Sequence, residues 1–171
     1  IGSYSNLPRF SEAPQDVIDA VLDSGSRFAS EVLQPINAIG DKQGCKRNPD
    51  GSVTTPTGFK EAYKQMSDNG WMAISADPEF GGQGLPRVVA MPFLEMCSSA
   101  NMAFSMYPGL TRGAAEAIQA GGSDEQKKTY LPNMVSGKWA GTMNLTEPQC
   151  GTDLGLIRTK ATPQPDGTYK I

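Results

Sequence analysis

The residues best suited to chemistry lie in one stretch, TMNLTEPQCGTDLG, at positions 142–155. Thr146 and Thr152 offer hydroxyl groups, and Pro148 enforces a bend between them. Gly151 lets the backbone approach a ligand closely, and the successive N–H groups beside it can form an anion-binding concavity. The stretch therefore indicates a site for a polar, phosphate-bearing ligand, and the alternative interpretation is a polar turn between two strands.

Other candidate sites have simpler interpretations. Glu147 is a conceivable general base, but nothing in the sequence brings it near a substrate proton, so an exposed or capping carboxylate is the prediction. Residues 81–84, GGQG, lack the flanking strand, helix and Gly-Lys-Ser/Thr ending of a phosphate loop and predict a tight turn. Methionine and aromatic side chains can line an acyl pocket, although core packing explains their helical spacing better: Met91, Phe93, Met96, Met102, Phe104, Met106 and Tyr107.

The composition excludes several classes of function. The chain has no histidine, which removes Ser-His-Asp and Cys-His nucleophile systems and most catalytic zinc sites. The cysteines, Cys45, Cys97 and Cys150, are far apart and predict small buried residues, with no metal site and no disulfide pattern. A net charge of -3 argues against nucleic acid as a partner. Because no apolar run reaches membrane-spanning length and the start lacks signal-peptide features, the sequence predicts a cytoplasmic protein.

The elements that must position residues 142–155 are mostly helical. Apolar residues at helical spacing over residues 14–33 predict a helix that Pro35 ends. Residues 37–56 have no period and many turn formers, which predicts a long loop. Further helices follow, with a kink or split expected at Pro92 and a break before Pro108. The last of them is predicted by a capping box formed by Ser123 and Gln126.

The pattern changes at Gly137. Over residues 138–145 the side chains alternate with a period of two, which predicts a strand. Residues 156–163 and 167–171 predict further strands, joined by a Pro-Asp-Gly turn. The expected fold class is therefore mainly α, with an N-terminal helical domain over residues 1–137 and the first strands of a β domain over residues 138–171.

Residues 141–161, GTMNLTEPQCGTDLGLIRTKA, resemble the flavin-binding signature of acyl-CoA dehydrogenases. In that signature a strand of small and apolar residues leads into Thr-Glu-Pro, then Gly, then Ser or Thr, then Asp. The resemblance extends upstream through residues 70–86, 98–118 and 122–139, in the order of that family's N-terminal helical domain. The segments GDKQGC and PTGFKEAYKQMSDNGW look most like the branch of larger members that includes the 3-methylmercaptopropionyl-CoA dehydrogenases.

The resemblance implies roles for five residues in the binding of FAD. Met143, Leu145 and Thr146 would face the isoalloxazine ring, with Thr146 at the pyrimidine edge. Thr152, with Gly151 beside it, would contact the pyrophosphate of FAD and lie near the thioester of the substrate. Many members have Ser at the position of Thr152, and the hydroxyl is retained here.

The reaction implied by the resemblance is α,β-dehydrogenation of an acyl-CoA. A Glu removes the α-proton while the β-hydrogen passes as hydride to flavin N5. That Glu is expected in a C-terminal part outside this chain, so no catalytic residue and no metal ligand are predicted here, and the chain is expected to be an inactive N-terminal part.

The partners implied by the resemblance are an acyl-CoA substrate and an electron-transferring flavoprotein, and the full-length protein is expected to be a homo-oligomer. Two alternatives remain for the function. One is a non-catalytic helical interaction module of the same fold, and the other is an acyl-CoA oxidase.

Overall fold

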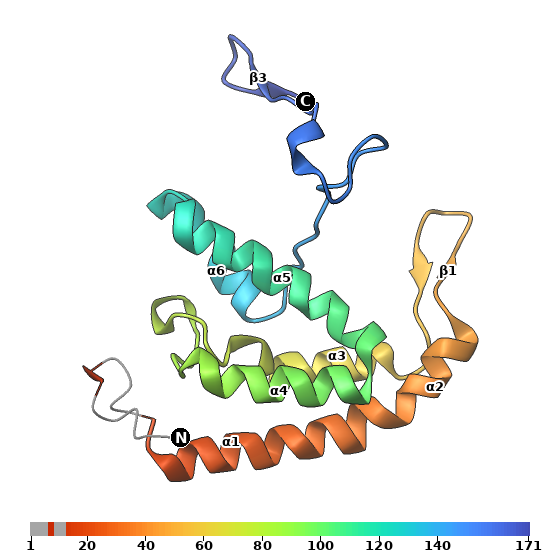
Figure 1. Ribbon diagram of the computed structural model, residues 1–171, viewed down its shortest axis with the longest axis vertical. Helices are drawn as coiled ribbons and strands as arrows, with labels where there is room; N and C mark the ends of the chain where they lie inside the picture. The colour runs from red at the N-terminus through yellow and green to blue at the C-terminus, as the bar shows by residue number, and fades with distance from the viewer. Residues whose placement is uncertain (1–6, 9–12) are drawn as a thin grey trace.

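The computed structural model describes residues 7–8 and 13–171 of the chain (Figure 1). Its first element is a long helix of three consecutive parts. These parts are α1 (Gln15–Arg27), the π-helical segment η3 (Phe28–Leu33) and α2 (Gln34–Gln43). The helix runs along one edge of the molecule, and the remaining helices all lie to one side of it.

Pro35 lies inside this helix, so the prediction that it ends the helix is wrong. In η3 the N–H of Gln34 donates to the carbonyl of Ala29, five residues earlier, as in a π-helix. The hydrogen-bond register restarts after this wide turn. Pro35 then falls in the first turn of α2, where its missing N–H is tolerated.

The prediction of one long loop over residues 37–56 is also wrong. The segment contains the end of α2 and a hairpin in which β1 (Lys46–Arg47) pairs antiparallel with β2 (Val53–Thr54). A Cβ at Gly40 would come within 2.6 Å of the Phe59 ring, so this glycine permits close packing inside a helix. Gly44, at φ +61°, is the residue that ends the helix.

A loop-rich segment joins α3 (Phe59–Asp68) to α4 (Arg87–Ala100) and contains the short 3-10 turns η4 (Trp71–Ala73) and η5 (Pro78–Phe80). The tight turn predicted at residues 81–84 is confirmed. Each of its four N–H groups donates to a nearby carbonyl at 2.9 to 3.1 Å. Because these groups are satisfied within the protein, the turn has none to offer a phosphate.

Three helices complete the body, namely α4, α5 (Met102–Gly121) and α6 (Asp124–Val135). Pro92 lies inside α4 without splitting it, and the break expected before Pro108 does not occur in α5. The predicted capping box of α6 is confirmed. Gln126 donates its N–H to Ser123 Oγ at 3.2 Å, and Ser123 donates its N–H to Gln126 Oε1 at 2.8 Å.

The corner between α4 and α5 is held by a buried asparagine, Asn101, which is 1% exposed. Its side-chain oxygen accepts the N–H of Phe104 at 3.0 Å and so caps the start of α5. Its side-chain nitrogen donates to the carbonyl of Leu33 at 3.3 Å. One polar side chain therefore joins α5 to the end of η3.

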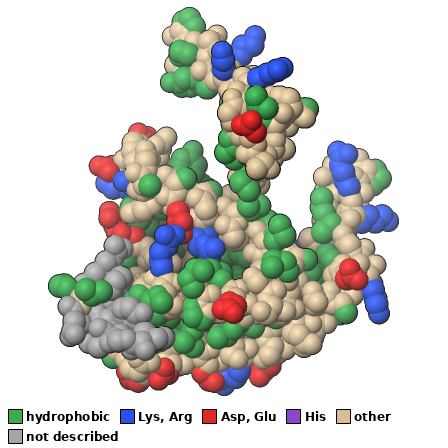
Figure 2. All heavy atoms as spheres, in the orientation of Figure 1, with side chains coloured by type: hydrophobic (Ala, Val, Ile, Leu, Met, Phe, Trp, Pro, Cys, Tyr) green, Lys and Arg blue, Asp and Glu red, His purple; other side chains and the backbone are tan. Residues whose placement is uncertain are grey.

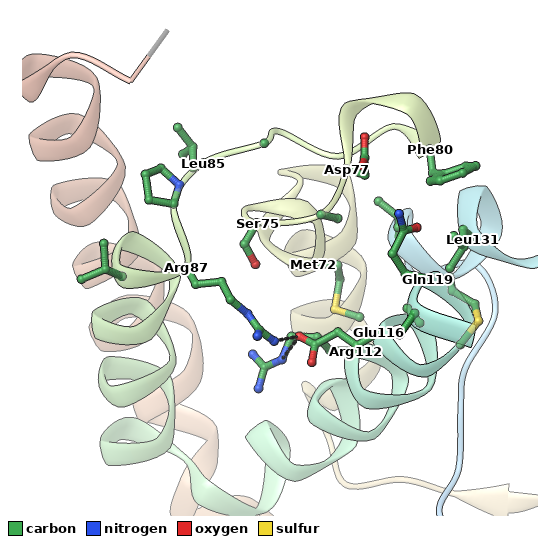
Figure 3. A pocket seen from close by; sticks show the side chains of 18 of the residues that line it. Met72, Ser75, Asp77, Phe80, Leu85, Arg87, Arg112, Glu116, Gln119 and Leu131 are labelled. Carbon is green, nitrogen blue, oxygen red and sulfur yellow. Dashed lines mark ion pairs between the residues drawn. The ribbon is translucent and has the colours of Figure 1, made fainter. Parts of the chain in front are cut away.

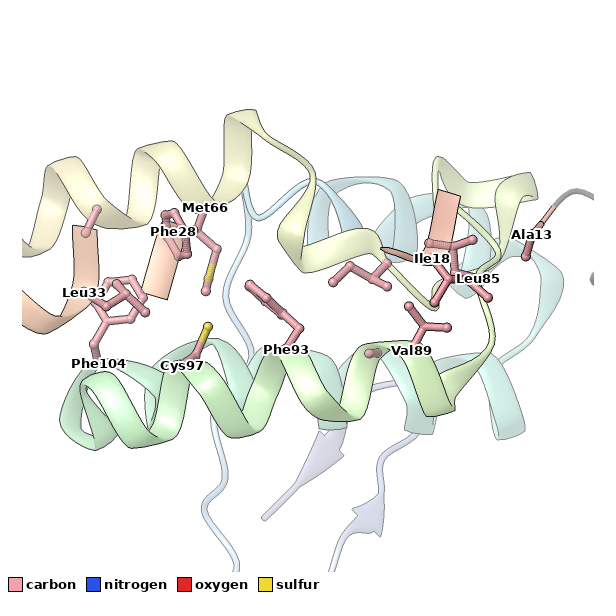
Figure 4. Close-up of a cluster of buried hydrophobic side chains, with 13 residues drawn as sticks. Ala13, Ile18, Phe28, Leu33, Met66, Leu85, Val89, Phe93, Cys97 and Phe104 are labelled. Atoms are coloured by element: carbon pink, nitrogen blue, oxygen red, sulfur yellow. The ribbon is translucent and has the colours of Figure 1, made fainter. Parts of the chain in front are cut away.

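The hydrophobic core lies between the first long helix, α3 and α4 (Figure 4). Phe93 is at its centre, 1% exposed, with its ring stacked on Trp71 at a centroid distance of 4.6 Å. A Cβ at Gly25 would lie 2.8 Å from the Phe93 ring, so α1 approaches α4 as closely as a glycine allows. Other members of this core include Ile18, Phe28, Leu33, Met66, Val89, Cys97 and Phe104.

After α6 the chain leaves the helical body as a narrow arm (Figures 1 and 2). The strand predicted over residues 138–145 does not form within the part of the chain that the structure describes. A strand needs a neighbour for its N–H and C=O groups, and the described residues place none beside this segment. The hairpin predicted around residues 165–167 is confirmed, with β3 (Thr162–Pro163) antiparallel to β4 (Tyr169–Lys170).

The fold class is mainly α with an N-terminal helical domain and few strands, as predicted, and one of the two short hairpins lies near the C-terminal end. The arm also contains the 3-10 turn η6 (Leu154–Leu156), which follows the stretch singled out in the sequence. Across residues 7–8 and 13–171, no helix combines the length and apolar character needed to cross a membrane.

Candidate functional site

A tight turn organises residues 142–155. The N–H of Glu147 donates to the carbonyl of Cys150 at 2.9 Å, and the N–H of Cys150 donates back to Glu147 at 3.1 Å. Cys150 is 4% exposed and Cys97 is also buried, as predicted, whereas the same prediction is wrong for Cys45, which is exposed. Thr146 and Gly151 directly flank this paired turn in the chain.

The Glu147 carboxylate braces the loop that follows the turn. Its Oε2 accepts the N–H of Arg158 at 3.0 Å, and its Oε1 accepts the N–H of Thr159 at 2.9 Å. Hydrogen bonds from the side chain and backbone of Thr159, and then from the backbone of Arg158, lower the pKa of Glu147 to about 2. Glu147 is therefore a capping carboxylate, as predicted.

The five residues predicted to bind FAD lie at the surface of the arm. Met143 is 66% exposed and Leu145 is 44% exposed, which are high values for apolar side chains. Within the described chain, the hydroxyl and the backbone N–H of both Thr146 and Thr152 have no hydrogen-bond partner. A Cβ at Gly151 would meet nothing within 4 Å, so its backbone is open to a ligand. We call residues 142–152 the shelf segment.

The shelf segment offers groups of the kinds that bind a flat ring and a phosphate. Exposed apolar side chains, Met143 and Leu145, can pack on a flat ring, and the Thr146 hydroxyl can bond to a polar edge of that ring. The adjacent N–H groups and hydroxyl of residues 151–152 can bond to phosphate oxygens. The residues present therefore fit a ligand that combines an aromatic ring system with a pyrophosphate.

Three side chains on the helices hold the start of the arm, and sequence reasoning missed all three. Tyr63 and Ser67, on α3, donate their hydroxyl hydrogens to the carbonyls of residues 136–137, with a distance of 2.8 Å for Tyr63. Thr111, on α5, accepts the N–H of Gly141 at 3.2 Å. The partners are separated by 30 to 74 positions in the sequence, so no local pattern could have identified them.

A second candidate site is a groove of about 850 Å³ between η5, the start of α4 and the C-terminal half of α5 (Figure 3). Apolar side chains such as Phe80 and Leu131 form much of its wall. Glu116 pairs with Arg87 and lies 4.0 Å from Arg112, so this ionic cluster carries a net positive charge. None of the five predicted site residues lines the groove.

The side chains considered for an acyl pocket divide into two groups. Phe93 and Phe104 are 1% and 4% exposed and belong to the core, as predicted. Met102 and Met106 are 58% and 65% exposed, and with Leu110, at 36%, they form an apolar stripe along α5. Core packing is therefore the wrong interpretation for Met102 and Met106 of this α5 stripe. Of the other side chains, Met91 and Tyr107 are exposed and Met96 is half-buried.

Comparison with known families decides what this arrangement belongs to. Residues 16–138 match the family described as acyl-CoA dehydrogenase, N-terminal domain. The chain belongs to the acyl-CoA dehydrogenase family. Members of the acyl-CoA dehydrogenase family are flavoprotein oxidoreductases of fatty acid metabolism. The match runs from the second residue of α1 to just beyond the end of α6.

Two curated members of the acyl-CoA dehydrogenase family illustrate the similarity. The chain is 46% identical, over 96% of its length, to the 3-methylmercaptopropionyl-CoA dehydrogenase of Ruegeria pomeroyi. It is 40% identical, over 91% of its length, to a butyryl-CoA dehydrogenase of Syntrophomonas wolfei. The predicted resemblance to the 3-methylmercaptopropionyl-CoA dehydrogenase branch is confirmed. The chain spans 28% and 26% of the lengths of these two relatives.

Solved structures share the fold. The butyryl-CoA dehydrogenase of Megasphaera elsdenii matches with a TM-score of 0.76 and 24% identity, covering 91% of this chain and 38% of that one. A chain in a structure that concerns the electron transferring flavoprotein of Acidaminococcus fermentans matches with a TM-score of 0.73 and 25% identity. That second match covers 87% of this chain and 36% of the other.

Proposed function

We propose that this chain is the N-terminal part of an FAD-dependent acyl-CoA dehydrogenase, which converts an acyl-CoA thioester into a 2-enoyl-CoA. Residues 1–137 form its helical domain, and residues 138–171 begin its β domain. The observation that carries the proposal is the shelf segment, where exposed apolar side chains lie beside unpaired hydroxyl and N–H groups. The family match over residues 16–138 supports it.

The residues of the shelf segment have distinct roles in this proposal. FAD, when bound, supplies the acceptor for the hydride that leaves the β-carbon. Met143 and Leu145 pack against the ring and exclude water from it, while Thr146 bonds to its polar edge. Gly151 and Thr152 bind the pyrophosphate, and the Thr152 hydroxyl also orients the thioester.

The acyl group has a matching surface on α5. The α5 stripe of Met102, Met106 and Leu110 is apolar and exposed, and methionine side chains adapt to chains of different shape. Gly141 packs on the same helix at Leu110 and Ala114, so the arm starts beside the stripe. An acyl chain along α5 therefore lies close to the place where the shelf segment begins.

The base that removes the α-proton lies outside this chain in our proposal. Glu147 is the carboxylate within the shelf segment, and its two oxygens already accept two backbone N–H groups. With a pKa lowered to about 2, it is a weak base at neutral pH. We assign the abstraction to a Glu of the C-terminal part, and the electrons to an electron-transferring flavoprotein.

The test is anaerobic addition of acyl-CoA thioesters to the purified full-length protein and, separately, to the 171-residue chain. We expect the full-length protein to lose its visible flavin absorbance, form the 2-enoyl-CoA and reduce an electron-transferring flavoprotein. The 171-residue chain is expected to do none of these. Acyl-CoA oxidation by this chain alone would contradict the proposal. In a parallel assay with dioxygen present, hydrogen peroxide formed in place of flavoprotein reduction would identify an oxidase.

A further inference from the structure

The arm is joined to the helical body by hydrogen bonds at a few points, and the last of them is at Gly141. Tyr63 and Ser67 hold residues 136–137 against α3, and Thr111 holds Gly141 against α5. Beyond Gly141, in the residues that the structure describes, no hydrogen bond connects the shelf segment to a helix. The Gly141 contact therefore sets where the free part of the arm begins.

Gly141 lies directly on the backbone of α5. A Cβ at this position would be 2.5 Å from the Cβ of Ala114 and 3.2 Å from both the Leu110 carbonyl oxygen and the Thr111 Cα. No real side chain tolerates a contact of 2.5 Å, and part of this contact is with rigid backbone. Only glycine permits this approach, so the position of the arm depends on it.

Thr111 supplies the polar half of the same contact. It is 1% exposed, and its Oγ1 accepts the half-buried N–H of Gly141 at 3.2 Å. An N–H that is shielded from water and left without an acceptor destabilises the arrangement that shields it. The hydroxyl at position 111 therefore favours the one placement in which Gly141 sits on α5.

We propose that Thr111 is a positioning residue for the flavin, acting through the N–H of Gly141. This inference rests on the proposed function. Met143 lies two positions after Gly141, a span of at most about 7 Å of extended chain, so a shift of Gly141 also moves the residues that would contact the ring. Because Thr111 is adjacent to Leu110 of the α5 stripe, one helix fixes the acyl surface and the start of the flavin surface together.

The test is Thr111→Val in the full-length protein, because valine keeps the shape of the side chain and removes the acceptor. We expect the Kd of the apoprotein for FAD, measured by flavin fluorescence, to rise about tenfold. Thr111→Ser retains the acceptor and is expected to restore the Kd to within about twofold of the parent. Restoration by serine separates the hydrogen bond from a general packing effect.

The matched control is Thr129→Val on α6, whose hydroxyl donates to the Glu125 carbonyl of the same helix at 2.8 Å and makes no hydrogen bond to residues 138–152. It is expected to leave the Kd unchanged. Gly141→Ala is an independent variant that should weaken FAD binding by a similar factor through the clash with Ala114. If Thr111→Val folds poorly, this second variant decides.

The measurements distinguish a failure of the proposed function from a failure of the role assigned to Thr111. A parent protein that binds no FAD overturns the proposed function and this inference with it. A parent that binds FAD, with Thr111→Val and Gly141→Ala both at the parent Kd, overturns the role of Thr111 alone.

Discussion

Glu147 is the residue of the arm whose pKa the fold lowers to about 2. Its ordinary pKa of 4.5 falls to about 2 in the folded arm, because the side chain and backbone of Thr159 and the backbone of Arg158 bond to the charged form. A lowered pKa gives stability that is complete above about pH 4.5 and is lost as the pH falls through about 2. We therefore expect the amide NMR signals of Arg158 and Thr159 to titrate with a midpoint near pH 2.

Glu147→Gln is the control for this titration, because glutamine keeps an acceptor oxygen and has no proton to gain. The acid transition of the two amides should disappear in that variant. A midpoint near the ordinary 4.5 in the parent chain would contradict the brace between Glu147 and residues 158–159.

At the scale of elements, the contact of α4 with α1 and η4 depends on one ring. Phe93 is 1% exposed and stacked on Trp71, and Gly25 admits it against α1. Phe93→Ala is expected to lower the free energy of unfolding by about 3–5 kcal/mol. Met91→Ala, on the same helix at 61% exposure, should change it by less than about 0.5 kcal/mol. If chemical denaturation gives the same loss of unfolding free energy for Phe93→Ala and Met91→Ala, the core does not centre on Phe93.

Elements that depend on local sequence patterns were predicted better than elements that depend on distant neighbours. The capping box of Ser123 and Gln126 is local, and it was predicted correctly. The end of the first helix was misplaced because Pro35 follows a π-helical turn that no local pattern reveals. The strand over residues 138–145 was predicted from alternation alone, which says nothing about a neighbouring strand.

In the candidate site, too, local features were predicted from the sequence and long-range contacts were not. The shelf segment was found because its glycine, hydroxyls and proline are contiguous in sequence. Thr111 and Tyr63 were missed because their contacts with the arm span 30 and 74 positions. Met102 and Met106 of the α5 stripe were taken for core because helical spacing gives the same pattern on a buried face and on an exposed one.

At the scale of the whole molecule, the helical body has a packed core, whereas the arm leaves apolar side chains uncovered (Figure 2). Met143 and Leu145 are 66% and 44% exposed, and the chain spans 28% of a relative to which it is 46% identical. In the proposed function, FAD and the rest of a longer protein cover these side chains. The proposed function therefore depends first on the binding of FAD at the shelf segment.

The direct test is the amount of FAD bound per chain in the full-length protein, compared with a Thr146→Ala, Thr152→Ala double variant. The account predicts a flavin spectrum with about one FAD per parent chain. It predicts that the double variant, with an unchanged circular dichroism spectrum, binds FAD about a hundredfold more weakly, because each lost hydroxyl contact is worth about 1.5 kcal/mol. A colourless parent, or a double variant that keeps the parent affinity, would contradict the account.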